Sequence, residues 1–169
     1  MTTTKRCIFM SMLIALNILL GRFICIKTAI IQISFGFITV SLAGYMLGPI
    51  SAGIIGAVSD VISTILFPQG VYFPGFTLTA FLAGIIYGLA FYKKQINVKR
   101  VLLTVVLINI IINSGMNTFL LSILTGKTFV ALLGLRTLKN LILIPIQTFL
   151  IYVSINRICS TAKANLFNN

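Results

Sequence analysis

The stretch ISAGIIGAVSDVISTILF, residues 50–67, decides the class of fold. It is apolar over the length that a helix needs to cross the hydrocarbon core of a bilayer, which is roughly 17 to 25 residues. It also carries Asp60, the one acidic residue in the 169-residue chain. A carboxylate inside a membrane is costly unless it has a partner, so Asp60 is a candidate for a functional site.

The composition extends this reading to the whole chain. Hydrophobic residues make up 59% and charged residues 8% of the sequence, and the mean hydropathy is +1.12. A soluble domain is about half apolar and a quarter charged. We therefore expect an all-α integral membrane protein, with residues 1–169 forming a single bundle of about six transmembrane helices. The predicted spans are 8–26, 33–48, 50–67, 75–92, 100–122 and 136–157.

The net charge of +12 comes from 13 Lys and Arg residues. In a chain this apolar, such a charge marks cytoplasmic loops and contacts with lipid headgroups more simply than it marks nucleic acid binding. Placing both termini in the cytoplasm leaves eight basic residues inside and five outside, which favours an N-in/C-in topology. Lys5 and Arg6 precede an apolar run without a convincing cleavage site, so we expect a retained first helix.

Catalysis and metal binding find little support in the sequence. There is no histidine, and the three cysteines are isolated. This argues against the common His/Cys metal sites and against a Ser-His-Asp triad. One acidic residue leaves few options for general acid–base chemistry, so we expect neither an enzyme nor a cofactor.

Five basic residues fall on the outer side in this topology. Long basic side chains at helix ends can reach the membrane interface, which explains Lys27 and Lys127. Arg136 and Lys139 are three residues apart and share a helical face, where two cations repel each other unless an anion lies near. Together with Arg22 they predict a basic cup open to the outside. Arginine suits an anionic ligand there because its planar fork can bind both oxygens of a carboxylate.

Asp60 lies about two helical turns below the same outer surface, counted back from Pro68. One interpretation is a buried ion pair with Arg22 or Arg136. The other is a site that binds ligand, because an ionised carboxylate accepts hydrogen bonds at two oxygens. It would match an adjacent N–H and NH2 edge of a nitrogen heterocycle.

Amide and aromatic side chains also collect toward the outer end. Asn109, Asn113 and Asn117 recur every four residues, and intramembrane amides often bridge helices. We expect Asn109 to do so, whereas Asn113 and Asn117 either bridge helices or bind polar atoms of a ligand. The aromatic residues form an interfacial belt or stack on a planar ligand; they include Phe35, Phe37, Tyr72, Phe73 and Phe76.

Pairs of small residues four apart permit close helix approach. Gly44 with Gly48, and Gly84 with Gly88, are expected to pack inside the bundle. Ser11 and Ala15, near the cytoplasmic end of the first span, are a candidate contact for a partner membrane protein.

These residues occur in blocks that resemble a known family, the substrate-binding S-components of energy-coupling factor (ECF) vitamin transporters, and most closely the folate-specific FolT branch. The resemblance covers nearly the whole chain. The blocks are LGRF (20–23), ISFGF (33–37), GFTLTAF (75–81), Asn117-Thr118, Gly126-Lys127, RTLK (136–139) and PIQ (145–147).

The resemblance implies six helices in a bacterial plasma membrane, an outward-facing vitamin site and no catalytic activity. It also implies two kinds of partner, a shared transmembrane coupling subunit and two ATPase subunits. This fits the absence of a Gly-x-x-x-x-Gly-Lys-Ser/Thr phosphate loop from the sequence. In the family an Ala-x-x-x-Ala motif on the first helix contacts the shared subunit, and Ser11 and Ala15 take its place here.

Folate would match these side chains. Its glutamate tail is a dianion, which suits Arg22, Arg136 and Lys139, and its pterin has a donor edge, which suits Asp60 and Asn117. Within transport, the alternative is another vitamin or heterocycle. From other classes, the alternatives are a membrane scaffold with internal ion pairs and an intramembrane enzyme.

Overall fold

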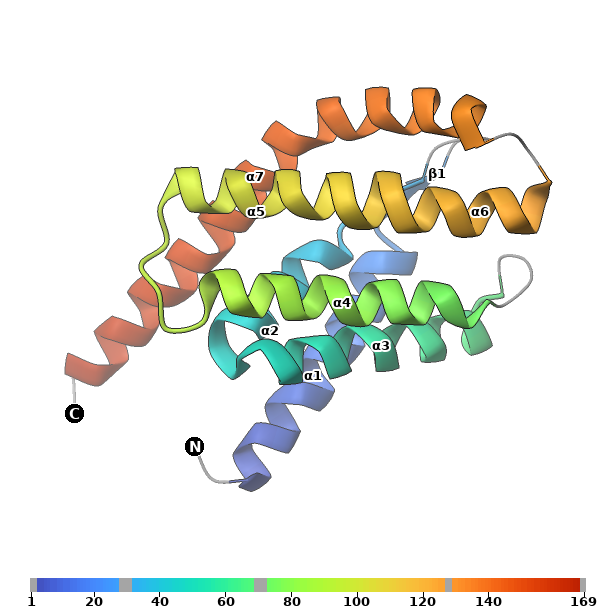
Figure 1. The fold of residues 1–169 in the computed structure, drawn as a ribbon. Coiled ribbons are helices and arrows are strands. Elements are labelled where there is room, and N and C mark those ends of the chain that lie inside the picture. The colour runs from blue at the N-terminus through green and yellow to red at the C-terminus, as the bar shows by residue number, and fades with distance from the viewer. Residues whose placement is uncertain (1–2, 28–31, 69–72, 127–128, 168–169) are drawn as a thin grey trace.

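The computed structural model describes residues 3–27, 32–68, 73–126 and 129–167, which form a bundle of helices with one short hairpin (Figure 1). The elements in chain order are α1 (Thr3–Arg22), β1 (Cys25–Lys27), β2 (Gln32–Ser34), α2 (Gly36–Leu47), α3 (Pro49–Leu66), α4 (Pro74–Phe91), α5 (Val98–Ile108), the π-helix η1 (Asn109–Met116), α6 (Asn117–Thr125) and α7 (Phe129–Phe167).

Five helical segments of the described chain are long and apolar enough to cross a membrane. Helices α3 and α4 match the predicted spans to within one residue, and α5, η1 and α6 run on without a break as one span. Helix α2 is shorter. At a rise of 1.5 Å per residue, its 12 residues span about 18 Å, against a hydrocarbon core of about 30 Å.

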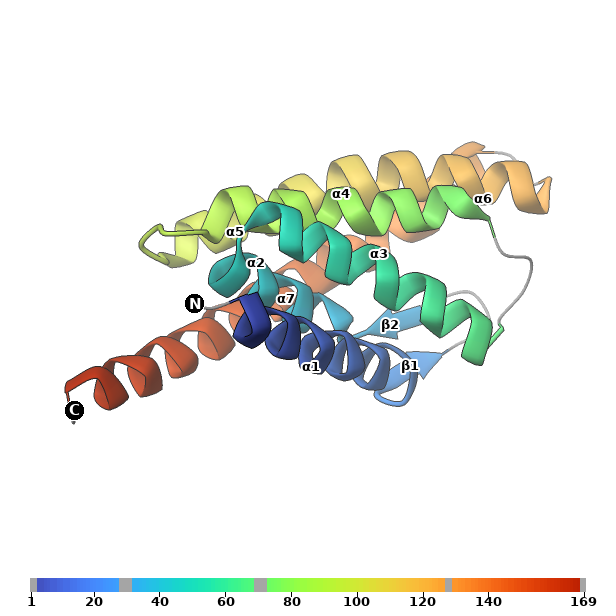
Figure 2. The same ribbon diagram turned by 90° about the horizontal axis from the view of Figure 1, so that it is seen from below.

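The first predicted span ended too late and the second began too early. The prediction carried helix to residue 26 and began the next at 33, but Cys25–Lys27 and Gln32–Ser34 pair as an antiparallel hairpin. Helix α1 closes when the backbone N–H of Phe23 and that of Ile24 both bond to the carbonyl of Leu19. Ile26 and Ile33 are opposite each other at the centre of the two strands, and β-branched residues suit extended backbone. Figure 2 shows the hairpin beyond the end of α1.

The up-and-down chain path gives the bundle two ends. We call the first the hairpin end; it holds the hairpin, the last turns of α1 and α3, the first turn of α4 and the start of α7. There the ring of Phe23 meets that of Phe67 edge to face, with centroids 5.5 Å apart. At the opposite, terminal end, Arg6 donates hydrogen bonds to Leu47 O (3.2 Å) and Ser51 Oγ (2.5 Å). Both chain termini lie toward the terminal end (Figure 1).

Small residues bring α3 and α4 into backbone contact, as expected for an internal packing face. A Cβ on Gly56 would lie 2.6 Å from the Ala80 carbonyl oxygen, and one on Gly84 would strike the carbonyl of Ala52. Gly44 meets the backbone of Gly88 in the same way at the interface of α2 and α4. The predicted packing role is thus confirmed for Gly44, Gly84 and Gly88.

The fourth glycine of the predicted pairs, Gly48, has a different role. It lies between α2 and α3 with φ at +90°, a conformation that side chains disfavour. Gly48 therefore makes the turn that the following Pro49 requires, because Pro49 fixes its own φ and starts α3.

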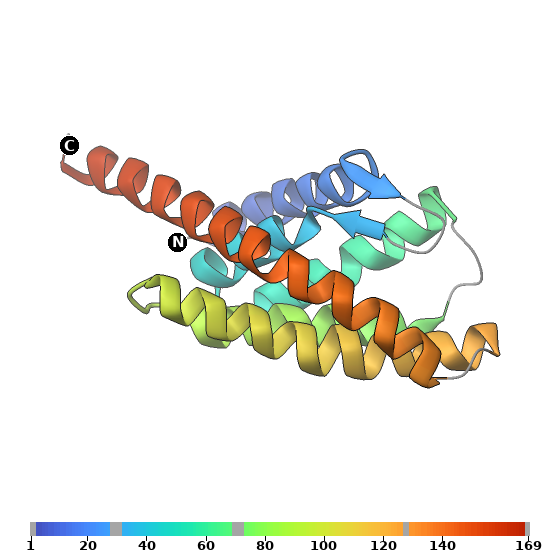
Figure 3. The same ribbon diagram turned by 90° about the horizontal axis from the view of Figure 1, so that it is seen from above.

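Helix α7 is the longest element, with 39 residues, and it contains Pro145. It begins at Phe129, seven residues before the predicted start at 136. Proline removes a backbone hydrogen bond inside a helix and bends it, and α7 bends in its course (Figure 1). Figure 3 shows α7 crossing the bundle from the hairpin end to the C-terminus.

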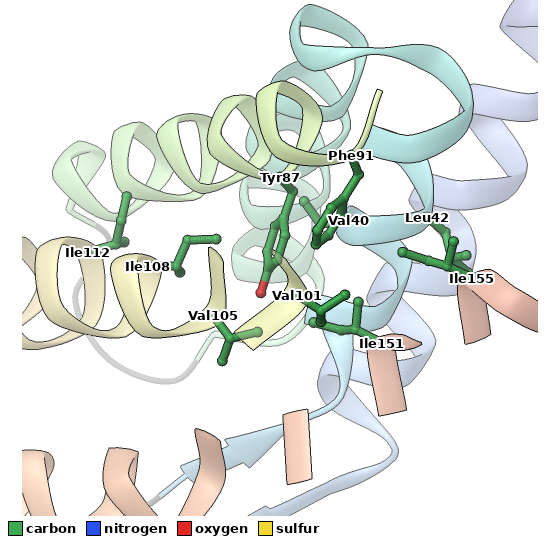
Figure 4. Close-up of a cluster of buried hydrophobic side chains, with 10 residues drawn as sticks. All are labelled: Val40, Leu42, Tyr87, Phe91, Val101, Val105, Ile108, Ile112, Ile151 and Ile155. Carbon is green, nitrogen blue, oxygen red and sulfur yellow. The ribbon is translucent and has the colours of Figure 1, made fainter. Parts of the chain in front are cut away.

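The apolar core fills the terminal half of the bundle. Phe91, Val101, Val105, Ile151 and Ile155 are fully buried, and they come from α4, α5 and α7 (Figure 4). The contact between Asp60 and Thr77 lies nearer the hairpin end.

Candidate functional site

The carboxylate of Asp60 is held by the neighbouring helix α4. Asp60 is half-buried near the hairpin end of α3, and Thr77 Oγ1 donates a hydrogen bond to its Oδ2 at 2.9 Å. Thr77 stands in the first turn of α4, three residues after Pro74, which starts the helix. The antiparallel course of α3 and α4 is what brings these two residues together.

A second polar structure, which we call the polar ladder, crosses from α4 through the fifth span to α7. It consists of Thr79, Asn117, Asn113, Asn109 and Gln147. Thr79 Oγ1 lies 2.8 Å from Asn117 Oδ1, and Asn117 Nδ2 donates to Asn113 Oδ1 at 3.3 Å. Asn113 Nδ2 then donates to Asn109 Oδ1 at 2.8 Å, and Asn109 Nδ2 to Gln147 Oε1 at 2.9 Å. The expected bridging role of Asn109 is confirmed.

The middle of the ladder lies on a π-helix. Element η1 covers Asn109–Met116, and its i→i+5 pattern is visible where the backbone N–H of Asn117 bonds to the carbonyl of Ile112. The hydroxyl of Thr118 bonds to the carbonyl of Asn113 at 3.1 Å. Such widened turns inside longer helices are frequent at functional sites.

Helix α7 meets the same region one step nearer the hairpin end. Asn140 Nδ2 donates to Ser114 Oγ at 3.1 Å, so α7 is fixed against η1 beside the ladder. The predicted site residue Lys139 directly precedes Asn140 and is half-buried. Arg136 lies on α7 one turn earlier, and its side chain lies outside the described residues.

Three predicted site residues lie at the end of α1 and the start of α2. Arg22 is half-buried in the last turn of α1. The rings of Phe35 and Phe37 are 6.3 Å apart and inclined at 39°, and the backbone N–H of Phe35 bonds to the carbonyl of Leu20. These residues share the hairpin end with Asp60 and Asn117. Tyr72, also predicted, lies outside the described residues.

Some polar contacts at this end were not predicted. Asn17 Nδ2 donates to Ser59 Oγ, and the Asn17 side chain fills the space that a Cβ on Gly36 would need. Asn17 was detectable as an isolated amide in an apolar helix. Thr77 and Thr79 were harder to identify, because two hydroxyl side chains shortly after the proline of α4 are common in membrane helices. Nothing in the sequence indicated that Thr77 would contact α3 and Thr79 would contact α6.

The predicted docking residues lie on the outside of the bundle. Ser11 and Ala15 are exposed on α1, and the Ser11 hydroxyl bonds to the carbonyl of Cys7 within the same helix. Their contact with a partner stays a prediction. Within the described part of the chain, no group of three or more His, Cys, Asp or Glu side chains is placed to hold a metal ion.

These features define a class of protein: a multi-pass helical membrane protein with polar side chains gathered at one end and an apolar core closing the other. The chain belongs to the family of ECF transporter substrate-specific components, which it matches over residues 5–155. It is accordingly a substrate-binding component of a transporter and not an enzyme.

Relatives and one solved structure support the assignment. The chain is 50% identical over 145 residues to the folate transporter FolT of Clostridium novyi (strain NT), covering 86% of this chain and 84% of the relative. It is 35% identical over 159 residues to FolT of Leuconostoc mesenteroides, covering 90% and 85%. The crystal structure of FolT bound with folic acid has a TM-score of 0.82 and 42% identity, covering 88% of this chain and 90% of that one.

Proposed function

We propose that this chain binds folate in the membrane and delivers it for import. The similarity to FolT bound with folic acid carries the proposal, because 42% identity and a TM-score of 0.82 extend over nearly all of both chains. A polar site at one end of the bundle, with an apolar core beneath it, is the arrangement that a captured water-soluble vitamin needs.

The pterin ring of folate is assigned to Asp60 and the polar ladder. The ring has an N–H and an NH2 group side by side, and a carboxylate accepts such a pair at its two oxygens. In the structure Thr77 already binds Oδ2 of Asp60 at 2.9 Å, which holds the carboxylate in one orientation. Asn117 and Asn113 supply further polar atoms, and Phe35, Phe37 and Tyr72 supply faces for stacking.

The glutamate tail of folate is assigned to the basic residues. The tail carries two carboxylates at neutral pH, and Arg22, Arg136 and Lys139 lie on α1 and α7 near the hairpin end. Cations in a region of low dielectric constant attract carboxylates more strongly than they would in water. The tail would therefore extend toward the outer surface and the pterin toward the core.

The surrounding topology follows from this assignment. We place the hairpin end outside and both termini in the cytoplasm of a bacterial cell, with residues 1–169 as one domain of six membrane helices that includes the short α2. Import would use a shared transmembrane coupling subunit and two ATPase subunits, with Ser11 and Ala15 on the exposed face of α1 as the docking point.

The test is calorimetric titration of the purified protein with folate, in parallel with the Asp60→Asn variant. A hydrogen bond to a charged group contributes about 1.5–3 kcal/mol, so Asp60→Asn should weaken folate binding by roughly tenfold to a hundredfold. Thr104→Val is the matched control, because the Thr104 hydroxyl bonds to Arg100 O on its own helix, away from Asp60, and should be dispensable.

Three outcomes would count against the proposal. No folate binding by the unsubstituted protein would overturn it, and a competition panel of other vitamins would then identify the ligand. Unchanged folate affinity in Asp60→Asn would remove Asp60 from the site and favour an internal ion pair. Folate uptake by liposomes that contain this chain alone would contradict the need for coupling subunits.

A further inference from the structure

The deep end of the polar ladder is buried within the bundle. Asn109 is 2% exposed, and on its own helix it stands between Val105 and Ile112, both members of the apolar cluster in Figure 4. Its Nδ2 group donates to Val105 O at 3.0 Å and to Gln147 Oε1 at 2.9 Å. Because buried amides are costly unless bonded, both protons of Asn109 are committed inside the protein.

The carbonyl of Val105 fixes the direction of every bond in the ladder. A backbone carbonyl can only accept, so Asn109 must turn its NH2 group toward it and its Oδ1 toward Asn113. Asn113 must then donate to Asn109 and offer its own Oδ1 to Asn117. Asn117 in turn must donate to Asn113 and point its Oδ1 toward Thr79.

The two end members of the ladder, Thr79 and Gln147, could not set this direction. The Thr79 hydroxyl lies 2.8 Å from both Phe76 O and Asn117 Oδ1. It can donate to Asn117, or it can donate to Phe76 and accept from a reversed Asn117. Gln147 is an amide and can also be turned over. Without Asn109, the hydrogen bonds of the ladder could therefore point in either direction. Reversing them would exchange the NH2 group and the carbonyl oxygen of Asn113 and of Asn117.

The direction of the ladder decides which atoms of Asn113 and Asn117 remain for a ligand. Each NH2 group carries two protons, and the ladder uses one of them at Asn113 and one at Asn117. In the observed sense, one N–H of Asn117 remains on the side away from Thr79. In the reversed sense the same place would hold the carbonyl oxygen.

We infer that Asn109 and Gln147 are positioning residues that set the ligand selectivity of this site, by fixing Asn117 with an N–H available for an acceptor atom of the ligand. The inference rests on the proposed function. The pterin edge of folate has an exocyclic oxygen, that of the 4-oxo group, beside the N–H and NH2 donors. Asp60 takes the two donors, and the N–H of Asn117 takes the oxygen.

Helix α4 contacts both of these groups. Thr77 bonds to Asp60 and Thr79 bonds to Asn117, and the two threonines are separated by a single residue in the first turns of α4. An acceptor on α3 and a donor on α6 are thereby tied to one short, rigid segment. Fixing both sides of a recognition edge in advance lowers the cost of ordering them when ligand binds.

The π-helix keeps the three asparagines in line. In an α-helix of 3.6 residues per turn, side chains four apart drift by about 40° around the axis. From Asn109 to Asn117 the drift would reach about 80°, which would turn the two ends of the row apart. The π turn over Asn109–Met116 contains more residues and opposes this drift.

The test compares folate with its 4-thioxo analogue, which keeps the ring N–H and the NH2 group that Asp60 accepts and replaces only the 4-oxo oxygen by sulfur, a weak acceptor. The variants are Asn109→Leu and the double variant Asn109→Leu with Gln147→Met, titrated beside the unsubstituted protein. The double variant removes both partners of the buried bond, which can be nearly neutral for stability, and so keeps the test valid if the single variant fails to fold. Thr148→Val is the matched control, since the buried Thr148 hydroxyl bonds only to Ile144 O among the described contacts.

We expect the unsubstituted protein and Thr148→Val to prefer folate over the 4-thioxo analogue by about tenfold. In the Asn109 variants this ratio should fall to within about threefold of unity, because both senses of the ladder become available. A purely structural role would weaken both ligands in parallel and leave the ratio unchanged, which would overturn the inference while folate binding stands. Equal affinities in the unsubstituted protein would also overturn it. Absence of folate binding would instead overturn the proposed function, and this inference with it.

Discussion

The close contact of α3 and α4 predicts that Gly56→Ala will damage both stability and ligand binding. An added Cβ would lie 2.6 Å from the Ala80 carbonyl oxygen and 3.2 Å from its carbonyl carbon. Ordinary contact begins at 3.4 Å, so the helices would have to separate by about 0.8 Å, the difference between 3.4 and 2.6 Å. The neighbour is backbone and cannot rotate away.

Two opposing terms set the size of the effect. Alanine favours helix over glycine by about 1 kcal/mol, whereas overpacking a tight interface costs about 1–3 kcal/mol. Since the clash is with backbone, we expect the second term to win. Asp60 lies one turn beyond Gly56, and the same separation would stretch the 2.9 Å bond from Thr77 to about 3.7 Å, beyond the range of a hydrogen bond.

The assay is thermal unfolding in lipid nanodiscs together with folate titration, with Gly134→Ala as the matched control. A Cβ on Gly134 would have nothing within 4 Å, so this variant should show only the gain in helix propensity. We expect Gly56→Ala to unfold several degrees below Gly134→Ala, at roughly 2–4 °C per kcal/mol for a chain of this size, and to bind folate more weakly. If Gly56→Ala and Gly134→Ala unfold at the same temperature and bind folate equally, the close contact of α3 and α4 does not position Asp60.

Two further predictions concern the site and the docking face. Thr77→Val should weaken folate binding by about tenfold, measured by titration, because it removes the donor that orients Asp60. The control Thr104→Val removes a hydroxyl bonded within its own helix at the terminal end, and an equal loss in both variants would contradict a specific role for Thr77. Ser11→Leu combined with Ala15→Leu should leave folate binding intact but reduce co-purification with the coupling subunit and folate uptake, since both residues are exposed. Uptake at the unsubstituted rate would exclude them as the docking point.

Some helix boundaries could be predicted from the sequence because a proline restricts the backbone at its own position. Pro49 and Pro74 each fix a helical φ at the first position of α3 and α4, and both predicted spans agree with the structure to within one residue. The hairpin had no such marker. Its strands have only three residues each, Cys25–Lys27 and Gln32–Ser34, which is too short for the alternating pattern that distinguishes a strand from a helix.

The site was predicted in part for the same reason. The four-residue spacing of Asn109, Asn113 and Asn117 is a local property of one helix, and it indicated a polar face that the structure confirms. The partners of that face lie on other helices. Thr79 comes from α4 and Gln147 from α7, and their meeting depends on the register between helices, which no spacing within a segment reveals.

Asp60 shows why that register matters more than the count of charges. With 13 basic residues in the chain, charge alone left an ion pair with Arg22 or Arg136 as one of two interpretations of the carboxylate. The structure adds a contact that charge did not predict, the hydroxyl of Thr77, which orients the carboxylate by donating a hydrogen bond to it. A carboxylate bound by a full cation would be satisfied before any ligand arrived, and a ligand would then have to displace that cation. One that is oriented by a hydroxyl would keep its charge for a ligand with paired N–H donors, so folate binding by Asp60→Asn and by Thr77→Val tests the two interpretations directly.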